Sequence, residues 1–346
     1  MNIAIATVQV PFIHGGAQDL AARLEAELCL RGLRAERITL PFRFFPPEAV
    51  MRCMDTWQAE DFTQINGYPV ERVICLSFPS YYLQHPHKLA WLIHQHRAVY
   101  ELWDTEASRE LRQSAAGQAL KARIWRQDTQ SLAQCRRLYT ISKEVSERLK
   151  RFNALDAQSL YHPPRLAAHL YCAEAEPYVF FPSRLEKLKR QDLLIEAMRH
   201  VHTPTKALIA GEGGMYDYYA AMISRYGLQQ RVRLLGAISD RELLACYARC
   251  LAVFFGPFRE DYGYVTLEAM LAAKPVICCR DSGGPLEFVV PGQTGYVVEP
   301  RAQDIARCID ELYRHRRQAA EMGAAGLERY RNLGISWGKV IQELMQ

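Results

Sequence analysis

Two carboxylates eight residues apart lie in a segment whose neighbouring residues suit anion binding. Glu260 lies in a predicted strand-to-helix loop, Glu268 lies on the helix that follows, and Gly263 stands at the bend between them. The first N–H groups of a helix have no partner within it and bind anions. The carboxylates cannot bind that anion, but they can accept hydrogen bonds from hydroxyl groups on either side of it. A nucleoside diphosphate sugar has this layout: ribose hydroxyls, two phosphates and sugar hydroxyls.

A pair of cations five residues apart supplies the positive charge that such a ligand needs. Arg184 follows a predicted strand, and Lys189 lies just before a predicted helix. A planar guanidinium and a compact ammonium together suit a diphosphate that carries two negative charges. Two further turns follow other predicted strands, at 211–213 and 236–239, and could contribute backbone groups to the same ligand site. The second turn could present an amide edge to a base.

Together these residues resemble the retaining glycosyltransferases of family 4, which have the GT-B fold. The resemblance covers nearly the whole chain and is strongest from about 178 to 298. The family's E-x7-E signature matches Glu260 and Glu268, and its Arg-x4-Lys pair matches Arg184 and Lys189. Its usual Glu-Gly-Phe-Gly sequence is Glu260-Asp261-Tyr262-Gly263 in this chain, so the loop departs from the family at Asp261.

The N-terminal half carries a looser resemblance. Gly15 and Gly16, in the first strand-to-helix loop, match the glycine pair that approaches the donor phosphate in this family. Family members also carry a histidine near the donor sugar, and both His94 and His96 are candidates here. We prefer His94 because it ends an apolar strand run, but the choice between the two stays open.

The resemblance implies transfer of a sugar, with retention at its anomeric carbon, from a nucleotide sugar to an acceptor hydroxyl. The donor is expected to be a UDP-sugar rather than a GDP-sugar, and the acceptor a glycan, a glycolipid or a small-molecule glycoside. In this interpretation Glu268 holds the ribose hydroxyls, Glu260 orients a C3 or C4 hydroxyl of the sugar, and a histidine contacts its C6 group. Positive charge and helix N–H groups stabilise the leaving diphosphate.

The sequence therefore gives a set of predicted site residues. The predicted catalytic residues are Glu260, His94, His96, Arg184 and Lys189. The predicted donor-binding residues are Gly15, Gly16, Arg184, Lys189, Gly211, Glu212, Gly213, Ala237, Ile238, Tyr262, Gly263, Tyr264, Val265, Thr266 and Glu268. We expect no metal and no cofactor, because no Asp-x-Asp is placed to bridge a diphosphate and the cationic side chains supply that charge.

Three other functions would use parts of the same pattern. A nucleotide-sugar epimerase or hydrolase would keep the fold and the donor, but the two carboxylates argue against an epimerase. A degenerate nucleotide-binding partner subunit would not need Arg184, Lys189, Glu260 and Glu268 all in place. A dinucleotide-dependent oxidoreductase would need a G-x-G-x-x-G turn after its first strand, which this chain lacks.

These residues must be positioned by strands and helices that alternate along the chain. Apolar runs typical of strands occur in the first half at 3–10, 35–40, 72–77, 90–94 and 137–141, and in the second half at 178–182, 206–210, 232–235, 251–255, 276–279 and 295–298. This alternation predicts an α/β protein of the GT-B type, with two Rossmann-like, doubly wound parallel-sheet domains that face a central cleft. Two prolines within 161–165 mark the linker.

The chain of 346 residues is long enough for two domains. We predict an acceptor-side domain at 1–162, a nucleotide-sugar-binding domain at 163–325, and a C-terminal helix at 326–346 that crosses back to the first domain. The ten cysteines include no C-x-x-C and are expected to be free thiols. No apolar run reaches the length of about 18 residues that spans a membrane, and residues 1–8 resemble a strand more than a signal peptide. We therefore expect a cytoplasmic protein.

A basic segment leaves the question of partners open. Residues 109–151 contain eleven Lys or Arg against four Asp or Glu. This excess is either a solvated helical face or a surface for anionic lipid at the inner membrane face or for a phosphorylated acceptor. No array typical of nucleic-acid binding is present, and the oligomeric state is not predicted. The segments 57–68 and 80–87, which are rich in aromatic residues, are candidate acceptor surfaces.

Overall fold

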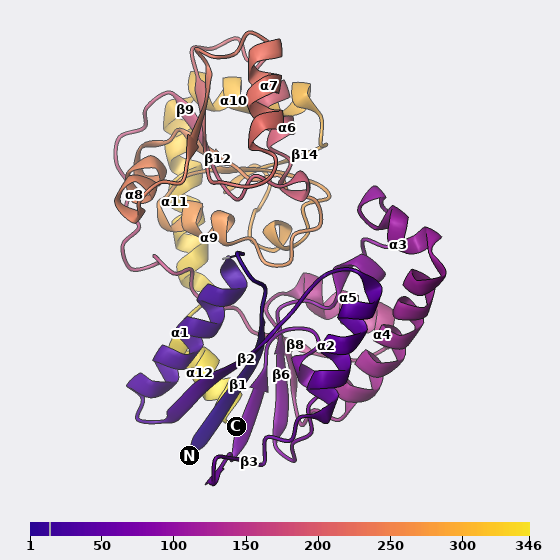
Figure 1. The fold of residues 1–346 in the computed structure, drawn as a ribbon. Helices are drawn as coiled ribbons and strands as arrows, with labels where there is room; N and C mark the ends of the chain where they lie inside the picture. The colour runs from indigo at the N-terminus through magenta and orange to yellow at the C-terminus, as the bar shows by residue number, and fades with distance from the viewer. Residues whose placement is uncertain (14) are drawn as a thin grey trace. The chain divides into compact units, whose positions relative to one another are not determined.

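The chain folds into two compact units, each built on its own sheet. The computed structural model describes residues 1–13 and 15–346. The first unit consists of Met1–His162 together with Ser336–Gln346, and the second consists of Pro163–Ile335. The chain can be followed by colour from its N-terminus to its C-terminus in Figure 1.

The first unit contains a six-stranded parallel sheet with strand order β2-β1-β5-β6-β7-β8. Every residue of β6 is buried, as expected where helices cover both faces of a parallel sheet. Helices α1 and α12 lie on one face, and α2, α4 and α5 lie on the other (Figure 1). A two-stranded hairpin of β3 and β4 stands outside the sheet. The elements are β1 (Asn2–Gln9), α1 (Gly16–Leu30), β2 (Arg34–Pro41), α2 (Pro47–Ala59), β3 (Gln64–Ile65), β4 (Tyr68–Pro69), β5 (Arg72–Cys75), β6 (Lys88–Leu92), α3 (Arg109–Gln113), α4 (Ala115–Ala133), β7 (Leu138–Thr140), α5 (Lys143–Asn153), β8 (Gln158–Ser159) and α12 (Trp337–Met345).

The second unit contains another six-stranded parallel sheet, with strand order β11-β10-β9-β12-β13-β14. Alternate residues of the central strand β9 pack into different cores: Val179 and Phe181 into one, Tyr178 and Phe180 into the other. Both faces of this sheet are therefore buried, which explains its nearly continuous apolar strands. The elements are β9 (Tyr178–Pro182), α6 (Gln191–Ala197), β10 (Lys206–Ala210), α7 (Tyr216–Arg225), β11 (Val232–Gly236), α8 (Asp240–Arg249), β12 (Ala252–Phe254), α9 (Tyr264–Leu271), β13 (Val276–Cys279), β14 (Gly295–Val298), α10 (Ala302–Arg314) and α11 (Arg316–Asn332).

The predicted α/β class with two parallel sheets is confirmed; the differences are shifted ends of elements and three short strands that were not predicted. The strand predicted at 90–94 is β6, which begins at Lys88 and ends at Leu92. Lys88 is buried within it because its ammonium donates hydrogen bonds to the carbonyl oxygens of Tyr81 and Leu83, at 2.7 and 3.0 Å. β3, β4 and β8 are the three strands outside the predicted set.

The last helix, α12, belongs to the first unit. Ser336 caps it by accepting a hydrogen bond from the N–H of Lys339 at 3.2 Å. The ring of Trp337 lies edge-on to Trp91 of β6, with 6.2 Å between ring centroids. Tyr139 of β7 adds a hydrogen bond from its hydroxyl to the carbonyl oxygen of Glu343 at 3.0 Å. The chain thus returns to the first sheet after leaving the second unit.

Candidate functional site

Most of the predicted donor-binding residues lie at one edge of the second sheet. Strands β9, β10, β11 and β12 are parallel neighbours, so their carboxyl ends share one edge, where ligands bind in open α/β sheets. Arg184 and Lys189 follow β9, Gly211 follows β10, and Glu260 lies in the loop between β12 and α9. The loops that carry these residues are therefore neighbours in space although they are distant in sequence.

The structure brings the ammonium of Lys189 and the carboxylate of Glu260 into direct contact. The Lys189 Nζ donates to Oε1 and Oε2 of Glu260, at 2.8 and 2.7 Å. Their side chains are 16% and 20% exposed, so the pair is partly shielded from water. An ammonium has three N–H groups, and this geometry leaves it the capacity for a further acceptor such as a phosphate oxygen.

Arg184 lies at the surface of the same loop. Its Nη1 pairs with Oε1 of Glu186 at 2.7 Å, and both side chains are nearly half exposed. Such an exposed pair contributes little to stability, so the guanidinium can change partner at low cost. The backbone carbonyl of Arg184 accepts a hydrogen bond from the side-chain amide of Gln191 at 2.9 Å, which ties the loop to the start of α6.

Glu268 is held by a tyrosine that the sequence analysis missed. The hydroxyl of Tyr247, on α8, donates to Oε2 of Glu268 at 2.6 Å. Tyr247 is fully buried, and burial together with the neighbouring carboxylate holds its pKa well above the usual value, so it stays a donor. Glu268 is half-buried on α9. The bond fixes one carboxylate oxygen and thereby the rotamer of the side chain.

The start of α9 combines a glycine in the left-handed backbone region with a buried cluster. Gly263 has a φ of +93° and precedes the helix, and its carbonyl accepts the N–H of Thr266 at 3.0 Å. That N–H is therefore engaged within the cap, while the Thr266 hydroxyl finds no partner among residues 1–13 and 15–346. Tyr262 is buried, edge-on to Tyr264 at 5.1 Å between ring centroids, so its ring packs in the protein. Val265 is half-buried on the same turn.

The glycines after β10 allow two loops to pack backbone against backbone. A Cβ on Gly211 would lie 2.1 Å from the carbonyl oxygen of Ser183, and one on Gly213 would lie 2.4 Å from that of Leu185. The carbonyl of Glu212 accepts the N–H of Leu185 at 2.8 Å, while the Glu212 side chain is exposed. This turn therefore supports the loop that carries Arg184.

The next turn, after β11, is anchored in a similar way. Gly236 accepts a hydrogen bond from the N–H of Gly211 at 2.8 Å. Ser239 then begins α8 with a capping box, in which its hydroxyl accepts the N–H of Glu242. Ala237 and Ile238 occupy the two positions between these anchors, at the same sheet edge as Gly211.

An arginine outside the predicted set clamps the loop that leads to Glu260. Arg190 pairs with both carboxylate oxygens of Asp281, at 2.9 and 2.7 Å, and donates to the carbonyl oxygens of Gly256 and Pro257. Glu260 itself pairs with Gly283 in a short parallel bridge. The position of Glu260 is thus set by the strand ends on both sides of it.

In the first unit, the glycine pair opens the first helix. Gly15 caps α1, its N–H donates to Oε1 of Gln18 at 3.1 Å, and Gly16 is the first residue of the helix. This loop follows β1 at the carboxyl edge of the first sheet. It is the place that the resemblance predicts for a glycine pair.

The two candidate histidines lie in different surroundings. His96 is 5% exposed among Phe42, Phe78 and Phe44, with its ring 5.1 Å from that of Phe78 and stacked on Phe44. Burial lowers the pKa of His96 to about 4, so the ring is neutral at pH 7. His94 is half-buried, with Nδ1 2.7 Å from the carbonyl oxygen of Gln95. Of the two histidines, His94 has the side chain that is more accessible to a ligand.

A buried carboxylate fixes the loop between these histidines. Asp128 of α4 accepts hydrogen bonds from the hydroxyls of Tyr81, Tyr82 and Tyr100, at 2.6 to 2.9 Å. Burial raises the pKa of Asp128 to about 6, against the lowering effect of these bonds. The side-chain amide of Gln95 reaches the same carboxylate at 3.4 Å. Tyr81 and Tyr82 therefore belong to the core, and their rings do not form an exposed acceptor surface.

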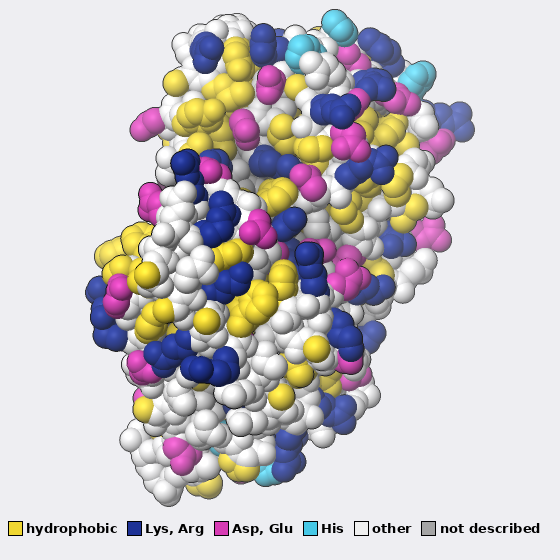
Figure 2. Space-filling model, turned by 90° about the vertical axis from the view of Figure 1, so that its right-hand side faces the viewer, with side chains coloured by type: hydrophobic (Ala, Val, Ile, Leu, Met, Phe, Trp, Pro, Cys, Tyr) yellow, Lys and Arg dark blue, Asp and Glu magenta, His cyan; other side chains and the backbone are white. Residues whose placement is uncertain are grey.

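The basic segment uses part of its charge within the first unit. Arg112 donates to the carbonyl of Trp103, Arg148 pairs with Glu101 and Glu144, and Arg123 pairs with Asp55. Figure 2 views the side that carries α3 and α4 and shows Lys and Arg side chains in groups, with acidic and apolar side chains between them. In the described chain, residue 14 apart, no group of three or more His, Cys, Asp or Glu side chains could hold a metal ion. In the same residues no helix has the length and apolar character to cross a membrane.

Comparison with known proteins identifies the class to which this architecture corresponds. Residues 170–329 match the family model described as glycosyl transferases group 1. Solved structures share the fold over the whole chain: sucrose-phosphate synthase from Thermosynechococcus elongatus has a TM-score of 0.80 at 17% identity, and each chain is 99% covered. Anabaena Alr3699/HepE in complex with UDP-glucose has a TM-score of 0.69 at 18% identity, with 100% of this chain and 98% of that chain covered. Residues 170–329 are thus similar to a glycosyltransferase family, and the whole chain shares the GT-B fold of these structures.

Curated relatives match a shorter part of the chain. The alpha-1,3/1,6-mannosyltransferase ALG2 of Dictyostelium discoideum is 36% identical over 104 residues, which are 30% of this chain and 24% of that protein. The GDP-mannose-dependent alpha-(1-6)-phosphatidylinositol monomannoside mannosyltransferase of Mycobacterium tuberculosis (strain ATCC 25618 / H37Rv) is 35% identical over 164 residues, which are 44% and 42% of the two chains. The matched part thus spans less than half the length of these relatives.

Proposed function

We propose that the protein is a retaining glycosyltransferase that moves a sugar from a nucleoside diphosphate sugar to an acceptor hydroxyl. The observation that carries the proposal is the contact between Lys189 and Glu260 at the sheet edge that also carries Arg184 and the start of α9. Cations and a carboxylate side by side suit a ligand whose phosphates adjoin hydroxyl groups. The matching family model and the curated relatives are named as sugar transferases, and this supports the same class of reaction.

In the proposed reaction the nucleoside diphosphate leaves and negative charge grows on its β-phosphate. Lys189, Arg184 and the N-terminus of α9 stabilise that charge without a metal. Removing one such donor from a preorganised site typically costs about 3–4 kcal/mol of transition-state stabilisation. No carboxylate is assigned as a nucleophile, so the acceptor attacks from the face that the diphosphate leaves, and a phosphate oxygen takes its proton.

The two carboxylates orient the donor at either end. Glu260 accepts hydrogen bonds from a C3 or C4 hydroxyl of the sugar. Glu268 accepts hydrogen bonds from the ribose hydroxyls, and Tyr247 fixes its rotamer before the donor arrives. A pre-oriented carboxylate loses less side-chain entropy on binding. His94 contacts the sugar near its C6 group in this proposal.

The donor base and the acceptor complete the proposal. The sequence favours uridine, whereas one relative is named for GDP-mannose, so UDP and GDP are the two nucleotides to compare. The acceptor is a glycan, a glycolipid or a small-molecule glycoside. Contact of the basic segment 109–151 with an anionic membrane is a separate proposal, and flotation with anionic liposomes at low salt tests it.

Thermal unfolding with UDP, GDP, ADP, TDP and NAD tests the donor site. A ligand at about 100 times its Kd adds about 2.7 kcal/mol to the free energy of unfolding. We expect one nucleoside diphosphate to raise Tm in the natural protein and not in Arg184→Ala. Arg199→Ala is the matched control, because Arg199 is also half-exposed and pairs with a nearby glutamate. No rise with any nucleotide, or an equal rise in Arg184→Ala, would contradict the donor site.

A further inference from the structure

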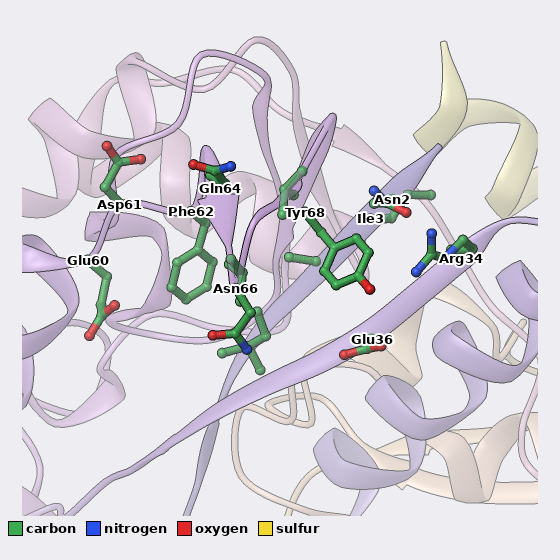
Figure 3. A pocket seen from close by; sticks show the side chains of 14 residues that line it. Asn2, Ile3, Arg34, Glu36, Glu60, Asp61, Phe62, Gln64, Asn66 and Tyr68 are labelled. Carbon is green, nitrogen blue, oxygen red and sulfur yellow. The ribbon is translucent and has the colours of Figure 1, made fainter.

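A cavity of about 780 Å³ lies in the first unit, at the end of its sheet opposite to Gly15 and Gly16 (Figure 3). It is lined by the beginnings of β1 and β2, the segment after α2, and the β3–β4 hairpin. Asn2 is the first residue of β1, whereas Gly15 follows the other end of that strand. With a rise of about 3.3 Å per residue, the strand separates the two ends by about 23 Å. The cavity is therefore distinct from the carboxyl edge of this sheet.

The cavity exists because one face of the sheet is incompletely covered at its edge. Parallel sheets normally carry helices on both faces. Ala35 of β2 is buried on one face, while its neighbours Arg34 and Glu36 point to the opposite face and line the cavity. On that face the small hairpin takes the place of a helix and leaves room of ligand size.

The hairpin wall is preorganised. Its turn is Asn66-Gly67, with φ of +50° and +82°, as in the tight turns that match the twist of paired strands. The side-chain amide of Asn2 donates to the carbonyl oxygen of Pro69 at 2.7 Å, and the N–H of Glu71 donates to the carbonyl of Asn2 at 3.0 Å. These bonds fix the hairpin to the start of β1, so the cavity does not need to form on binding.

An aromatic ring stands at the mouth of the cavity. Tyr68 is 58% exposed, so much of its ring is open to a ligand. The guanidinium of Arg34 lies 5.4 Å from the centroid of that ring and holds it by a cation–π contact. Figure 3 shows the ring reaching from the hairpin toward β2, near Arg34 and Glu36. An exposed, oriented ring can stack on the C–H face of a pyranose.

Polar side chains with unused hydrogen-bonding capacity surround the ring. Within residues 1–13 and 15–346, no hydrogen bond or ion pair engages the side chains of Glu36, Glu60, Gln64 or Asn66. Carboxylates accept hydrogen bonds, and amides both donate and accept, which suits the paired donor and acceptor character of sugar hydroxyls. Counting Asp61, three carboxylates face one guanidinium in the lining, so the cavity disfavours phosphates, nucleotides and acidic sugars.

We propose that this cavity is a carbohydrate-binding site for a neutral or amino oligosaccharide, separate from the proposed transfer site. The binding itself does not depend on the proposed function. The role of such binding in catalysis rests on the proposed function: a glycan bound in the cavity would stay attached to the enzyme, which raises the effective concentration of the glycan at the transfer site.

Methyl NMR of the full chain labelled at the Ile δ1 carbons tests the proposal. Ile3, Ile38 and Ile65 line the cavity and serve as local reporters, while Ile209 and Ile277 report on the second unit. The probes are mannohexaose, maltohexaose and chitosan hexamer, each titrated without nucleotide. We expect shifts at the three cavity methyls and none at the two methyls of the second unit. Because no donor is present, a failure of the proposed transfer reaction would not affect this result.

Two variants make the test specific. Tyr68→Ala removes the ring and should weaken binding of the best probe about tenfold. Tyr171→Ala, at a similarly exposed tyrosine of the second unit, should leave binding unchanged. Glu36→Gln gives an independent loss of affinity if the first variant unfolds. The proposal fails if no probe shifts the cavity methyls, if Tyr68→Ala and Glu36→Gln both bind as the natural protein does, or if spermidine or Mg²⁺ gives the same shifts as the sugars.

Discussion

The pairing of Lys189 with Glu260 leads to opposite predictions for nucleotide binding and for transfer. In Glu260→Gln the ammonium loses its anionic partner and the repulsion of a carboxylate beside the phosphates disappears. We therefore expect the bare nucleoside diphosphate to bind as tightly as before or more tightly. Transfer should fall, because the carboxylate that orients the sugar is gone. In Lys189→Met, nucleotide binding and transfer should both fall.

The magnitudes follow from the geometry of the pair. Lys189 and Glu260 share two charge-assisted hydrogen bonds of 2.8 and 2.7 Å, and their side chains are 16% and 20% exposed. The pair therefore contributes more to stability than an exposed ion pair, which contributes about 0–1 kcal/mol. Losing one charged contact to phosphate costs about 2 kcal/mol in Lys189→Met, or about 30-fold in Kd. Relief of repulsion in Glu260→Gln gains about 1 kcal/mol, or about fivefold. Misplacement of the sugar lowers kcat about 100-fold.

Titration calorimetry with UDP and GDP gives the affinities, and initial rates with the accepted donor give kcat. Glu176→Gln is the control, because Glu176 forms an exposed ion pair with Arg249 in the same unit. If Glu260→Gln weakens nucleotide binding as much as Lys189→Met does, Glu260 acts by holding the lysine and not by holding the sugar. That result would refute the assignment of Glu260.

Three further predictions concern the residues that support the site. Tyr247→Phe removes the hydrogen bond to Glu268 and should raise KM for the donor about tenfold with kcat nearly unchanged, as steady-state kinetics will show. Gly211→Ala places a Cβ 2.1 Å from the carbonyl oxygen of Ser183 at a φ of +134° and should lower the free energy of unfolding by about 2–4 kcal/mol in urea titrations. Asp128→Asn should gain about 2 kcal/mol of stability relative to the natural protein as pH rises from 4 to 6. Burial raises the pKa of the Asp128 carboxyl to about 6 in the folded protein, so the natural protein loses stability over this range while the unfolded chain ionises first.

Matched variants keep these predictions separate from general damage to the fold. Tyr219→Phe removes a buried hydroxyl whose acceptor is a carbonyl at 3.5 Å, and should leave KM unchanged. Gly214→Ala adds a Cβ with no atom within 4 Å, and should leave stability nearly unchanged. For Asp128, parallel stability curves of variant and natural protein between pH 4 and 6 would contradict the proposed titration. The difference between the curves matters, since burial of His96 adds an opposite pH dependence.

The sequence predicted the sheets and the loops that carry the candidate site residues, since both depend on local patterns. Apolar runs mark the buried parallel strands, and Arg184 and Glu260 stand where such runs end. The contact between Lys189 and Glu260 joins residues 71 positions apart and exists because β12 pairs directly with β9. Strand order is a property of the whole sheet, so no local pattern could predict this pair.

Other residues of the site left little or no signal. Tyr247 occupies a buried position of an ordinary helix, where a tyrosine and a phenylalanine give the same pattern. Tyr81 and Tyr82 could equally have been exposed, and only the approach of Asp128 from α4 makes them core residues. The Asn66-Gly67 pair is different: it is a strong local hairpin signal, and it could have predicted β3 and β4.

The glycines near the candidate site show why a family motif and a binding role are separate statements. Gly211 and Gly213 are required because any Cβ would collide with the carbonyl oxygens of the loop that carries Arg184. Gly283 is required in the same way, since a Cβ there would lie 2.6 Å from the carbonyl oxygen of Glu260. Each glycine therefore fixes the backbone beneath a charged side chain. A protein that kept these turns and lost its donor would still need the glycines, whereas it would not need Lys189 paired with Glu260. The charged pair is thus the better evidence for a sugar transferase.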